Sequence, residues 1–565
     1  MDKKEIDRRE FLKASKYLVL VPCYPLLKGC GGSSSSSSGD DSTTTDTGDS
    51  ATDTEESTTT LVIPPLVEPN VDNQISLQAN NGTTNFYDGV SSITKGFVDV
   101  NNDAGTSYLG PTIRVRSYNT NSSSTGTAMV DQGTQTNGID GTDFNRVNFS
   151  VFNNTSEVIS SHWHGLHVDG FSDGGPFNSI AAGATWEPAL EIYQQAGTNW
   201  YHTHIHGTTA EDVYKGLAGM FIIDDANSIA LDAAGLPSTY GVDDIPLIIQ
   251  DKVFNSNILD STNVGGRFKG DVFLVNGVVT PNLEVEAGLV RFRILNASNA
   301  RFYDFSITSG GETGNFDQIA TEGGFLSSAV NLSSLRMTPG ERNEIVIDFS
   351  SYSEGDVVSL VSPDNEDTTG LDDPFTLMTF TVVAQTSQTA NNLIPATLNA
   401  DIAADRAALV AKTPDAYVYI HLKGGAAPFA SLRSTTEVVN GLDNVVDVTF
   451  DPTTANFVST STQTTPGYTE LWHIRGATHP FHLHGCHGMI NAIAGVMPSD
   501  DKQGWKDVFE VTGGNDVTFL VQFNERAYAA GSAAGPGAGS DFMYMMHCHI
   551  LGHEDDGMMG VFEVI

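Results

Sequence analysis

The sequence predicts an all-β protein of three consecutive β-sandwich domains, on three observations. Glycine (56) and proline (22) are common in the 565 residues while charged residues make up only 17%, a turn-rich composition that suits many short strands. From about residue 61, short apolar runs alternate with clusters of Gly, Asn, Asp and Ser, the pattern of sandwich strands. A strand that closes on Asn or Gly recurs at roughly domain spacing, in VNFSVFNNTS (147–156), VRFRILNASN (290–299) and ELWHIRGATH (470–479).

Two breaks in the strand pattern predict the domain limits. Residues 227–244 are rich in Ala, Gly and Pro, and residues 385–416 are polar and then weakly helical. We therefore expect domains at 61–227, 245–386 and 415–565. Residues 118–145 and 527–540 lack strand alternation, so we expect them to be loop insertions. The second insertion directly precedes the densest cluster of chemical groups, where it could shape a substrate entrance.

The charge of the chain excludes one large class of function. Lys plus Arg is 28 against 69 Asp plus Glu, a formal net charge of −41. A nucleic-acid binder needs a basic surface that neutralises phosphates, so this class is disfavoured. The acidity instead favours solubility and the approach of cations over anions.

Residues 1–30 have the features of an export signal. A charged start that contains Arg8 and Arg9 precedes the apolar run 17–27, which is too short to span a bilayer. The stretch RREFLK resembles the twin-arginine export signal, whose pathway carries folded proteins. An ordinary secretory signal with chance arginines is the alternative.

The segment after the signal predicts a tethered protein. Leu27-Lys28-Gly29-Cys30 looks like the cleavage box of a bacterial lipoprotein, in which Cys30 would receive the lipid, although Lys28 departs from the usual small or apolar residue. Residues 31–60 hold almost nothing apolar and only negative charges, so we expect a disordered Ser/Thr/Asp tether. We expect a monomer in the bacterial periplasm or tethered to the outer membrane.

The histidines are clustered. Ten of the 15 fall into four groups: His162 with His164, His202 with His204, His479 with His482 and His484, and His547 with His549 and His553. A His-X-His pair on a strand directs both imidazoles to the same face, because side chains alternate with a period of two. Two groups lie in the first predicted domain and two in the third, so a metal site would close only where these domains meet.

Cys548 separates two of these histidines and must face the opposite side of their strand. Together with His553 and an upstream histidine it supplies a thiolate and two imidazoles, and Met558 follows as a weak axial ligand. Two His, one Cys and a long Met bond form the blue-copper geometry. Zinc is the alternative metal, but a structural zinc site closes with four ligands, which ten histidines and a thiolate far exceed.

The remaining histidines and one further cysteine have no predicted ligand role. We interpret five histidines as surface residues or as residues behind the ligands: His167, His206, His421, His473 and His487. We expect Cys486 to be a buried free thiol.

Four segments carry a resemblance to a known family. SHWHGLH, WYHTHIHG, HPFHLHG and HCHILGHEDDGMM resemble, in order and spacing, the copper motifs of the multicopper oxidases, which include laccases, bilirubin oxidases and bacterial copper-efflux oxidases. The resemblance covers nearly all of residues 61–565, including DGGP (173–176) and GWKDVFEV (504–511). It implies three cupredoxin-like Greek-key β-sandwich domains.

The resemblance also implies four coppers per chain, with no ligand of the family pattern missing. The type 1 copper would take His479, Cys548 and His553, with Met558 axial. The type 2 copper would take His162 and His482, and the paired type 3 coppers would take His164, His202, His204, His484, His547 and His549. Methionine at the axial place implies a lower potential than in fungal high-potential laccases.

The implied activity couples a one-electron oxidation to the reduction of O2. A reductant would give electrons at the type 1 site, Cys548 would pass them through His547 and His549, and O2 would leave as two waters. Asp173 and Glu554 match family positions on the proton route. The alternative for Asp173 is that it only caps the DGGP turn.

The reductant is less well defined. Copper-efflux oxidases carry Asp and Met just before the HPFH histidine, whereas Arg475 and Ala477 stand four and two residues before His479. Their methionine-rich segment is also absent, since residues 356–381 hold only Met378. Three methionines precede Cys548, but a core role explains them equally well: Met543, Met545 and Met546.

These differences favour a laccase-like oxidase of a phenol or an aromatic amine over a cuprous or other metal-ion oxidase. A copper-binding envelope protein of the same fold without catalysis is the non-enzymatic alternative. Such relatives typically lack several ligands, and the set here is complete. A two-domain nitrite reductase is disfavoured, because it would not need both type 3 pairs.

Overall fold

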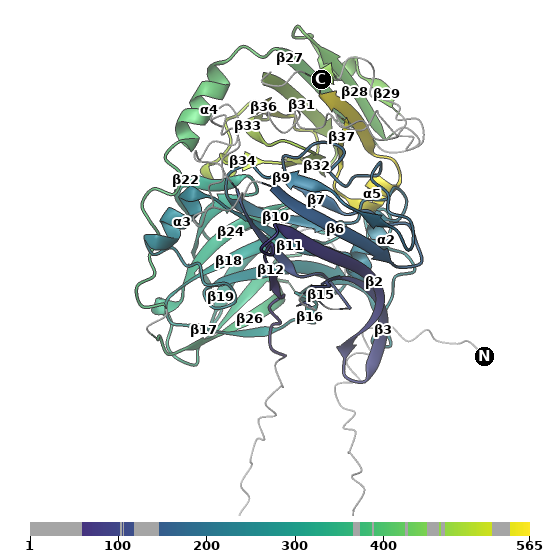
Figure 1. Cartoon of the computed structure of the whole chain (residues 1–565). Helices are drawn as coiled ribbons and strands as arrows, with labels where there is room; N and C mark the ends of the chain where they lie inside the picture. Colours follow the sequence, from purple (N-terminus) through teal and green to yellow (C-terminus); the bar gives the residue numbers. More distant parts are fainter. Residues whose placement is uncertain are drawn as a thin grey trace, which may run out of the picture. The chain divides into compact units, whose positions relative to one another are not determined.

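The computed structural model describes most of the chain after the predicted tether (Figure 1). The described residues are 59–101, 104–105, 107–117, 146–364, 373–386, 389–423, 428–448, 463–464, 469–522 and 543–564. The predicted export signal, the anchor at Cys30, nearly all of the tether at 31–60 and the insertions at 118–145 and 527–540 lie outside them. In the described residues, no helix is both long and apolar enough to cross a bilayer.

The first sandwich packs two sheets around one core. One sheet has the order β1 (Leu66–Val67), β5 (Thr112–Arg116), β11 (Ala218–Asp224), β10 (Gly197–His202) and β7 (His162–His164). The other has the order β4 (Ala104–Gly105), β3 (Val90–Asp99), β2 (Gln74–Tyr87), β6 (Arg146–Asn154) and β8 (Thr185–Trp186), with β9 (Ala189–Glu191) also on β6. Burial alternates along β6, so Val147, Phe149 and Val151 enter the core.

The second sandwich is built in the same way. One sheet has the order β16 (Val278–Val279), β15 (Val272–Val275), β12 (Asp244–Lys252), β18 (Leu289–Asn296), β24 (Arg342–Asp348), β21 (Phe316–Thr321) and β22 (Gly324–Leu332). The other has the order β17 (Asn282–Glu286), β26 (Phe375–Val383), β25 (Val357–Ser362), β19 (Tyr303–Ser309) and β20 (Glu312–Gly314), with β23 (Leu335–Met337) also on β19. A separate hairpin pairs β13 (Phe254–Asn255) with β14 (Ile258–Leu259).

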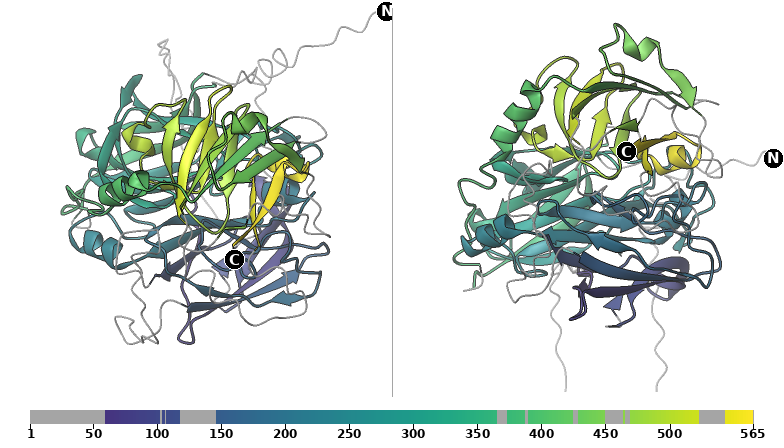
Figure 2. Two further views of the ribbon diagram at one scale, coloured as in Figure 1. Left: turned by 90° about the horizontal axis from the view of Figure 1, so that it is seen from above. Right: turned by 45° about the horizontal axis from the view of Figure 1, so that its top comes forward.

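The third sandwich carries the last two histidine groups. One sheet has the order β29 (Val446–Val448), β28 (Phe429–Ser434), β27 (Ala416–Leu422), β31 (Thr469–Gly476), β36 (Val517–Gln522), β33 (Gly488–Ile493) and β34 (Trp505–Lys506). The other has the order β30 (Gln463–Thr464), β38 (Met559–Val564), β37 (Met543–Cys548), β32 (His479–Leu483) and β35 (Val508–Val511). Figure 2 shows these strands, in green and yellow, against the other two sandwiches.

The recurring phrase occupies the same place in all three sandwiches. The strands that contain it are β6, β18 and β31, and each pairs in parallel with the long strand that opens its sandwich: β2, β12 and β27. This equivalence accounts for the repeat, since the same strand pattern forms the corresponding strand in each of the three sandwiches. The prediction of three consecutive cupredoxin-like sandwiches is confirmed, while the exact domain limits stay a prediction.

Within the described residues, the helices are short and lie in connections. They are α2 (Thr209–Lys215), α3 (Ala226–Ala233), α4 (Ile402–Ala411) and α5 (Leu551–Asp555), with single 3-10 turns η1 (Phe349–Ser351), η2 (Gly441–Asp443) and η3 (Asp500–Lys502). α4 lies in the weakly helical break that the sequence predicts. α3 begins with a capping box between Asp225 and Ser228 in the other break. α5 joins β37 to β38 and carries two predicted site residues, His553 and Glu554.

A buried ion cluster joins the second and third sandwiches. The Lys506 Nζ atom lies 2.7 and 2.8 Å from the two carboxylate oxygens of Glu322 and 2.8 Å from Oε1 of Glu341. The three residues are buried, so removing the cation would leave two carboxylates in a region without water.

We expect Lys506→Met to lower the free energy of unfolding by about 3–5 kcal/mol, the usual cost of breaking a buried ion pair from one side. Lys502→Met is the matched control, since Lys502 is more exposed and lies 3.6 Å from Glu510, and it should cost no more than about 1 kcal/mol. Urea denaturation of the three proteins measures both effects. Equal stabilities for the two variants would contradict this account of the interface.

Candidate metal centre

Eight histidines from two sandwiches form one buried cluster. The first sandwich supplies His162 and His164 from β7, His202 from the end of β10, and His204; the third supplies His482 from β32, His484, His547 from β37, and His549. All eight side chains are buried. Strand register aligns them, because His162 is opposite His202 in one sheet and His482 is opposite His547 in the other.

The two sandwiches bring their imidazoles into direct contact. His162 stacks on His484 with ring centroids 3.9 Å apart, and His164 stacks on His482 at 3.7 Å. His547 Nε2 lies 3.2 Å from His204 Nε2 and 3.1 Å from His484 Nε2. The predicted meeting of the terminal domains at the histidines is therefore present in the structure.

Strand placement differs from the prediction in one respect. Only the His162 pair lies entirely within a strand; β10 ends at His202, β32 ends at Leu483 and β37 ends at Cys548. His204, His484 and His549 therefore follow their strands. The pairing of β37 with β32 continues one residue further, because His549 N donates to Pro480 O at 2.7 Å, and the rings of the three histidines point into the shared cluster.

The cluster has the chemistry that a metal requires. Groups of three histidines have one ring nitrogen each within 4.8 Å of one another, among them His162 with His482 and His484, and His204 with His484 and His547. The Nε2 atoms of His162 and His482 are buried without a hydrogen-bond partner. Neutral imidazole is a good ligand for copper, so the residues fit copper ions.

Burial holds most of these imidazoles neutral. It is the largest cause that lowers the pKa of His164, His202, His204, His482, His484 and His549 well below the usual value, and neighbouring histidines contribute. Burial also lowers the pKa of His547 to about 3. A protonated imidazole cannot bind a metal, so the fold prepares these side chains for ligation.

A second group lies on the other face of β37. One ligand atom each from His479, Cys548 and His553 lies within 4.8 Å of the others, with Cys548 Sγ 3.8 Å from His553 Nδ1. Met558 is held beside them, since its N–H donates to His553 O at 2.9 Å and its carbonyl accepts from Cys548 N at 3.1 Å. Cys548 packs in the core of the third sandwich, and His547 faces the eight-histidine cluster. The predicted division of the two neighbours between opposite faces is therefore correct.

Comparisons with known proteins agree with this geometry. Residues 114–228 and 443–565 match family models described as multicopper oxidase. The multicopper oxidase mco of Staphylococcus aureus is 31% identical over 514 residues, which are 89% of this chain and 91% of that protein. The chain belongs to the multicopper oxidase family.

Another relative and one solved structure extend the comparison. The cell division protein FtsP of Sodalis glossinidius is 31% identical over 516 residues, 89% of this chain and 91% of that protein. The crystal structure of the McoA multicopper oxidase of Aquifex aeolicus superposes with a TM-score of 0.69 at 28% identity and covers 90% of this chain and 99% of that one. The family resemblance stated from the four motifs is confirmed.

Both predicted acids of this multicopper oxidase lie on the histidine cluster. Asp173 binds a histidine from each sandwich: its carbonyl accepts from His162 Nδ1 at 2.9 Å and its Oδ2 from His484 Nδ1 at 2.8 Å. Its carboxylate is thus directed at a histidine of the other sandwich, which a turn cap alone would not require. Glu554 places its two oxygens 3.1 Å from His204 Nδ1 and 3.3 Å from His547 Nδ1. Each acid therefore spans the two sandwiches.

Asp507, which contacts the cluster, and Arg342, which contacts Asp507, are missing from the sequence-based prediction. Asp507 Oδ1 accepts from His164 Nε2 at 3.2 Å, and the Asp507 carbonyl accepts from His482 Nδ1 at 2.9 Å. Although burial raises the pKa of the Asp507 carboxyl, Arg342 holds it well below its usual range. The charged Lys506-Asp507 pair between the apolar residues Trp505 and Val508 of GWKDVFEV is the signal that could have revealed Asp507. No local signal marks Arg342.

The five histidines without a predicted ligand role divide into two kinds. His167 and His487 are buried with ring centroids 4.3 Å apart, and His487 Nε2 lies 3.4 Å from Asp507 Oδ2. His206, His421 and His473 are half-buried. The expectation for Cys486 is met, since it is a buried free thiol whose pKa is raised by burial.

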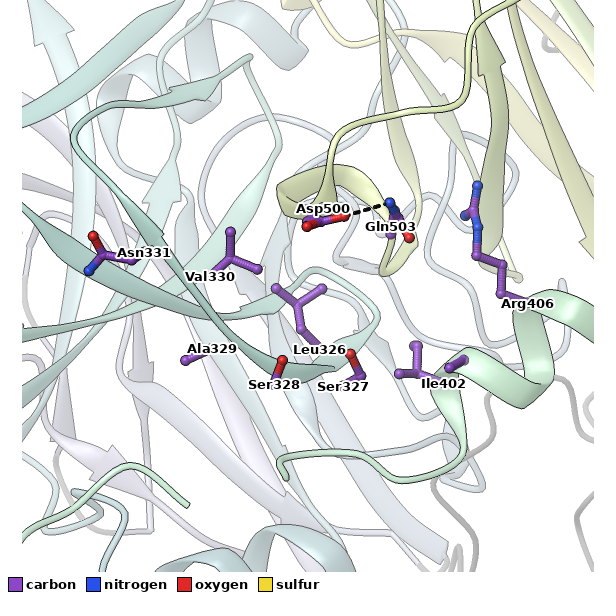
Figure 3. Close-up of a pocket in the computed structure, with 11 residues that line it drawn as sticks. Leu326, Ser327, Ser328, Ala329, Val330, Asn331, Ile402, Arg406, Asp500 and Gln503 are labelled. Carbon is purple, nitrogen blue, oxygen red and sulfur yellow. Dashed lines mark hydrogen bonds between the residues drawn. The ribbon is translucent and has the colours of Figure 1, made fainter. Parts of the chain in front are cut away.

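One surface pocket is remote from this chemistry. A pocket of about 410 Å³ lies between β22, α4 and η3 (Figure 3), and none of its lining residues belongs to either metal group. Arg406 at its edge donates to Ile490 O at 2.7 Å. The pocket therefore gives no argument about the metal chemistry.

The copper-free protein should lose stability as the pH falls from about 6.5 to about 4. Burial lowers the pKa of His479 and of His553 to about 4, whereas histidines of the unfolded chain titrate near 6.5. Between these values the unfolded chain binds more protons than the folded one, which favours unfolding. The Tm of the copper-free protein at pH 7.5, 6 and 5 measures this, and a Tm that stays level or rises on acidification would contradict it.

Proposed function

We propose that this protein is a laccase-type multicopper oxidase that couples the one-electron oxidation of a phenol or an aromatic amine to the reduction of O2 to water. The observation that carries the proposal is the adjacency of Cys548 and His547 in β37, which joins the two metal groups by one peptide unit. A protein that only stores copper would not need this connection between a thiolate site and an eight-histidine cluster.

The proposed ligands divide among one type 1, one type 2 and two type 3 coppers. His479, Cys548, His553 and axial Met558 would hold the type 1 copper, and His162 and His482 the type 2 copper. The type 3 coppers would take His164, His202, His204, His484, His547 and His549. The buried and unpartnered Nε2 atoms of His162 and His482 support the type 2 assignment.

When bound, copper would supply the one-electron steps and the reaction with O2. The chain itself provides a rigid and dry surrounding, since all eight histidines of the cluster are buried. Asp173 orients His484 through Nδ1, and Glu554 Oε1 lies 3.1 Å from His204 Nδ1. Both acids stand where a carboxyl group can pass protons toward the cluster.

The surroundings of the group formed by His479, Cys548 and His553 favour an organic molecule over a metal ion as the reductant. His553 is partly exposed there, and Arg267 is exposed beside it and donates to the carbonyl of Thr478, the residue before His479. Within a Debye length of about 8 Å, this guanidinium opposes a metal cation despite the acidity of the whole chain. Neutral phenols and phenolates are not opposed in this way.

The methionines before Cys548 support the same choice. Met543, Met545 and Met546 are buried, the last in the core of the third sandwich. Their thioethers are therefore packing groups and do not present a soft ligand for Cu(I) at the surface.

A second candidate function is favoured by one comparison. The similarity to the cell division protein FtsP of Sodalis glossinidius suggests a structural role in cell division in place of catalysis. The complete ligand set argues against this alternative, because a purely structural protein has no need to keep twelve copper ligands and two acids in place.

We further propose that the chain is exported, folded, and tethered to the membrane through a lipid on Cys30. The RREFLK stretch, the cleavage box and the acidic Ser/Thr-rich segment support this location. Metabolic labelling with a fatty acid, with Cys30→Ser as the control, tests the anchor.

The purified full chain should bind four coppers and consume O2 with a phenolic reductant. A copper count with paramagnetic resonance, followed by O2 uptake under matched conditions with a phenol or Cu(I), is the decisive measurement. We expect kcat/KM to be higher for the phenol. A many-fold preference for Cu(I) would replace the laccase-type assignment, and four coppers without turnover would support the structural alternative.

Glu554→Gln should slow O2 reduction ten-fold or more, because the amide cannot pass protons to the cluster. The visible absorption of the Cys548 site should persist, since the substitution leaves its ligands in place. Asp556→Asn is the control, as Asp556 is exposed two residues further along the chain. Turnover at the wild-type rate would remove Glu554 from the proton route.

A further inference from the structure

We propose that Arg342 of the second sandwich is a positioning residue for the eight-histidine cluster, acting through Asp507 on His164 and His482. This inference rests on the proposed function, because it concerns how the copper ligands are held. The second sandwich supplies no ligand, so the proposal gives it a defined part in the chemistry.

The first step is the contact between the two charged groups. Arg342 Nη1 donates to Asp507 Oδ1 at 2.7 Å, and Arg342 Nη2 donates to Asp507 Oδ2 at 2.6 Å. Both side chains are fully buried. Two parallel N–H···O bonds fix the plane of the carboxylate as well as its position.

The second step leads from Asp507 to the cluster. Its Oδ1 accepts from His164 Nε2 at 3.2 Å and its carbonyl accepts from His482 Nδ1 at 2.9 Å. These two imidazoles belong to different sandwiches and stack at 3.7 Å with an interplanar angle of 7°. One residue therefore orients a pair of rings on which the closure of the cluster depends.

The remaining donors of Arg342 attach it to the first and second sandwiches, in addition to the third sandwich that it reaches through Asp507. Nε donates to Thr198 O at 3.0 Å and Nη2 to Asn199 Oδ1 at 3.3 Å, both in β10 of the first sandwich. Nη1 donates to Gly340 O at 3.0 Å in the second sandwich. All five N–H donors of the guanidinium thus have an acceptor, and no other side chain offers five in one plane.

Two glycines show how tightly this arrangement is enclosed. A Cβ atom on Gly165, the residue after His164, would lie 2.8 Å from Asp507 Oδ2, and a Cβ on Gly340 would lie 2.9 Å from the ring of His549. Both glycines have positive φ, +93° and +86°. The backbone at Gly165 and Gly340 therefore approaches Asp507 and His549 too closely for any side chain at these two positions.

The test compares Arg342→Lys with Arg293→Lys, both in the copper-loaded full chain. Arg293 is a matched control, because it is buried in the same sandwich, pairs with Asp244 and Glu344 and also contacts Thr198, but touches no histidine of the cluster. Lysine keeps the charge and loses the planar fork.

We expect Arg342→Lys to change the paramagnetic resonance of the type 2 copper and to lower the affinity of the cluster for copper by about 10- to 100-fold. The visible absorption of the Cys548 site should be retained, and Arg293→Lys should keep all wild-type signals. A purely structural role would instead lower the Tm of both variants and leave the resonance unchanged, which would overturn the proposal.

Asp507→Asn keeps the proposal testable if Arg342→Lys does not fold, since it preserves shape and removes the charged acceptor. It should give the same altered resonance with the Cys548 absorption intact, and wild-type resonance in a folded Asp507→Asn protein would overturn the proposal. A wild-type protein that binds no copper or takes up no O2 would refute the proposed function itself. Failure of the positioning role alone leaves wild-type copper content and turnover in every variant.

Discussion

The burial of eight imidazoles in one space between the first and third sandwiches is the constraint on which the rest of the structure depends. An imidazole nitrogen carries either one hydrogen or one lone pair, so His547 Nε2 cannot form hydrogen bonds with both of the Nε2 atoms that lie beside it. Bound metal ions would resolve this conflict, and the surrounding groups would then hold the rings in place. Asp173, Glu554 and Asp507 each contact histidines of both terminal sandwiches.

The alternation of side chains along β37 links the Cys548 group to the eight-histidine cluster. His547 faces the cluster, and Cys548 enters the core beside Phe481 and Met558. A single strand therefore separates a partly exposed edge, where a reductant can approach His553, from a closed cluster. In the proposed function, this separation would keep the molecule that is oxidised away from the site of O2 reduction without a longer path through the protein.

The second sandwich contributes charge contacts and no predicted ligand. Lys506 lies between two of its carboxylates, and Arg342 reaches Asp507, so both interactions cross from the second sandwich to the same short segment of the third. This segment joins β34 to β35 and carries the carbonyl that accepts from His482. The second sandwich thus stabilises a site whose histidines come from the first and third sandwiches.

Much of the fold and of the metal groups can be predicted from local periodicity in the sequence. The threefold strand phrase predicts the three sandwiches, and the His-X-His spacing with an inserted Cys548 predicts two sites on opposite faces, because alternation along a strand is a local property. The roles of Arg342 and Asp507, 165 residues apart, arise from long-range contacts that no spacing encodes. The strand ends at His202 and Cys548 and the burial of His167 against His487 likewise depend on how the sandwiches pack together.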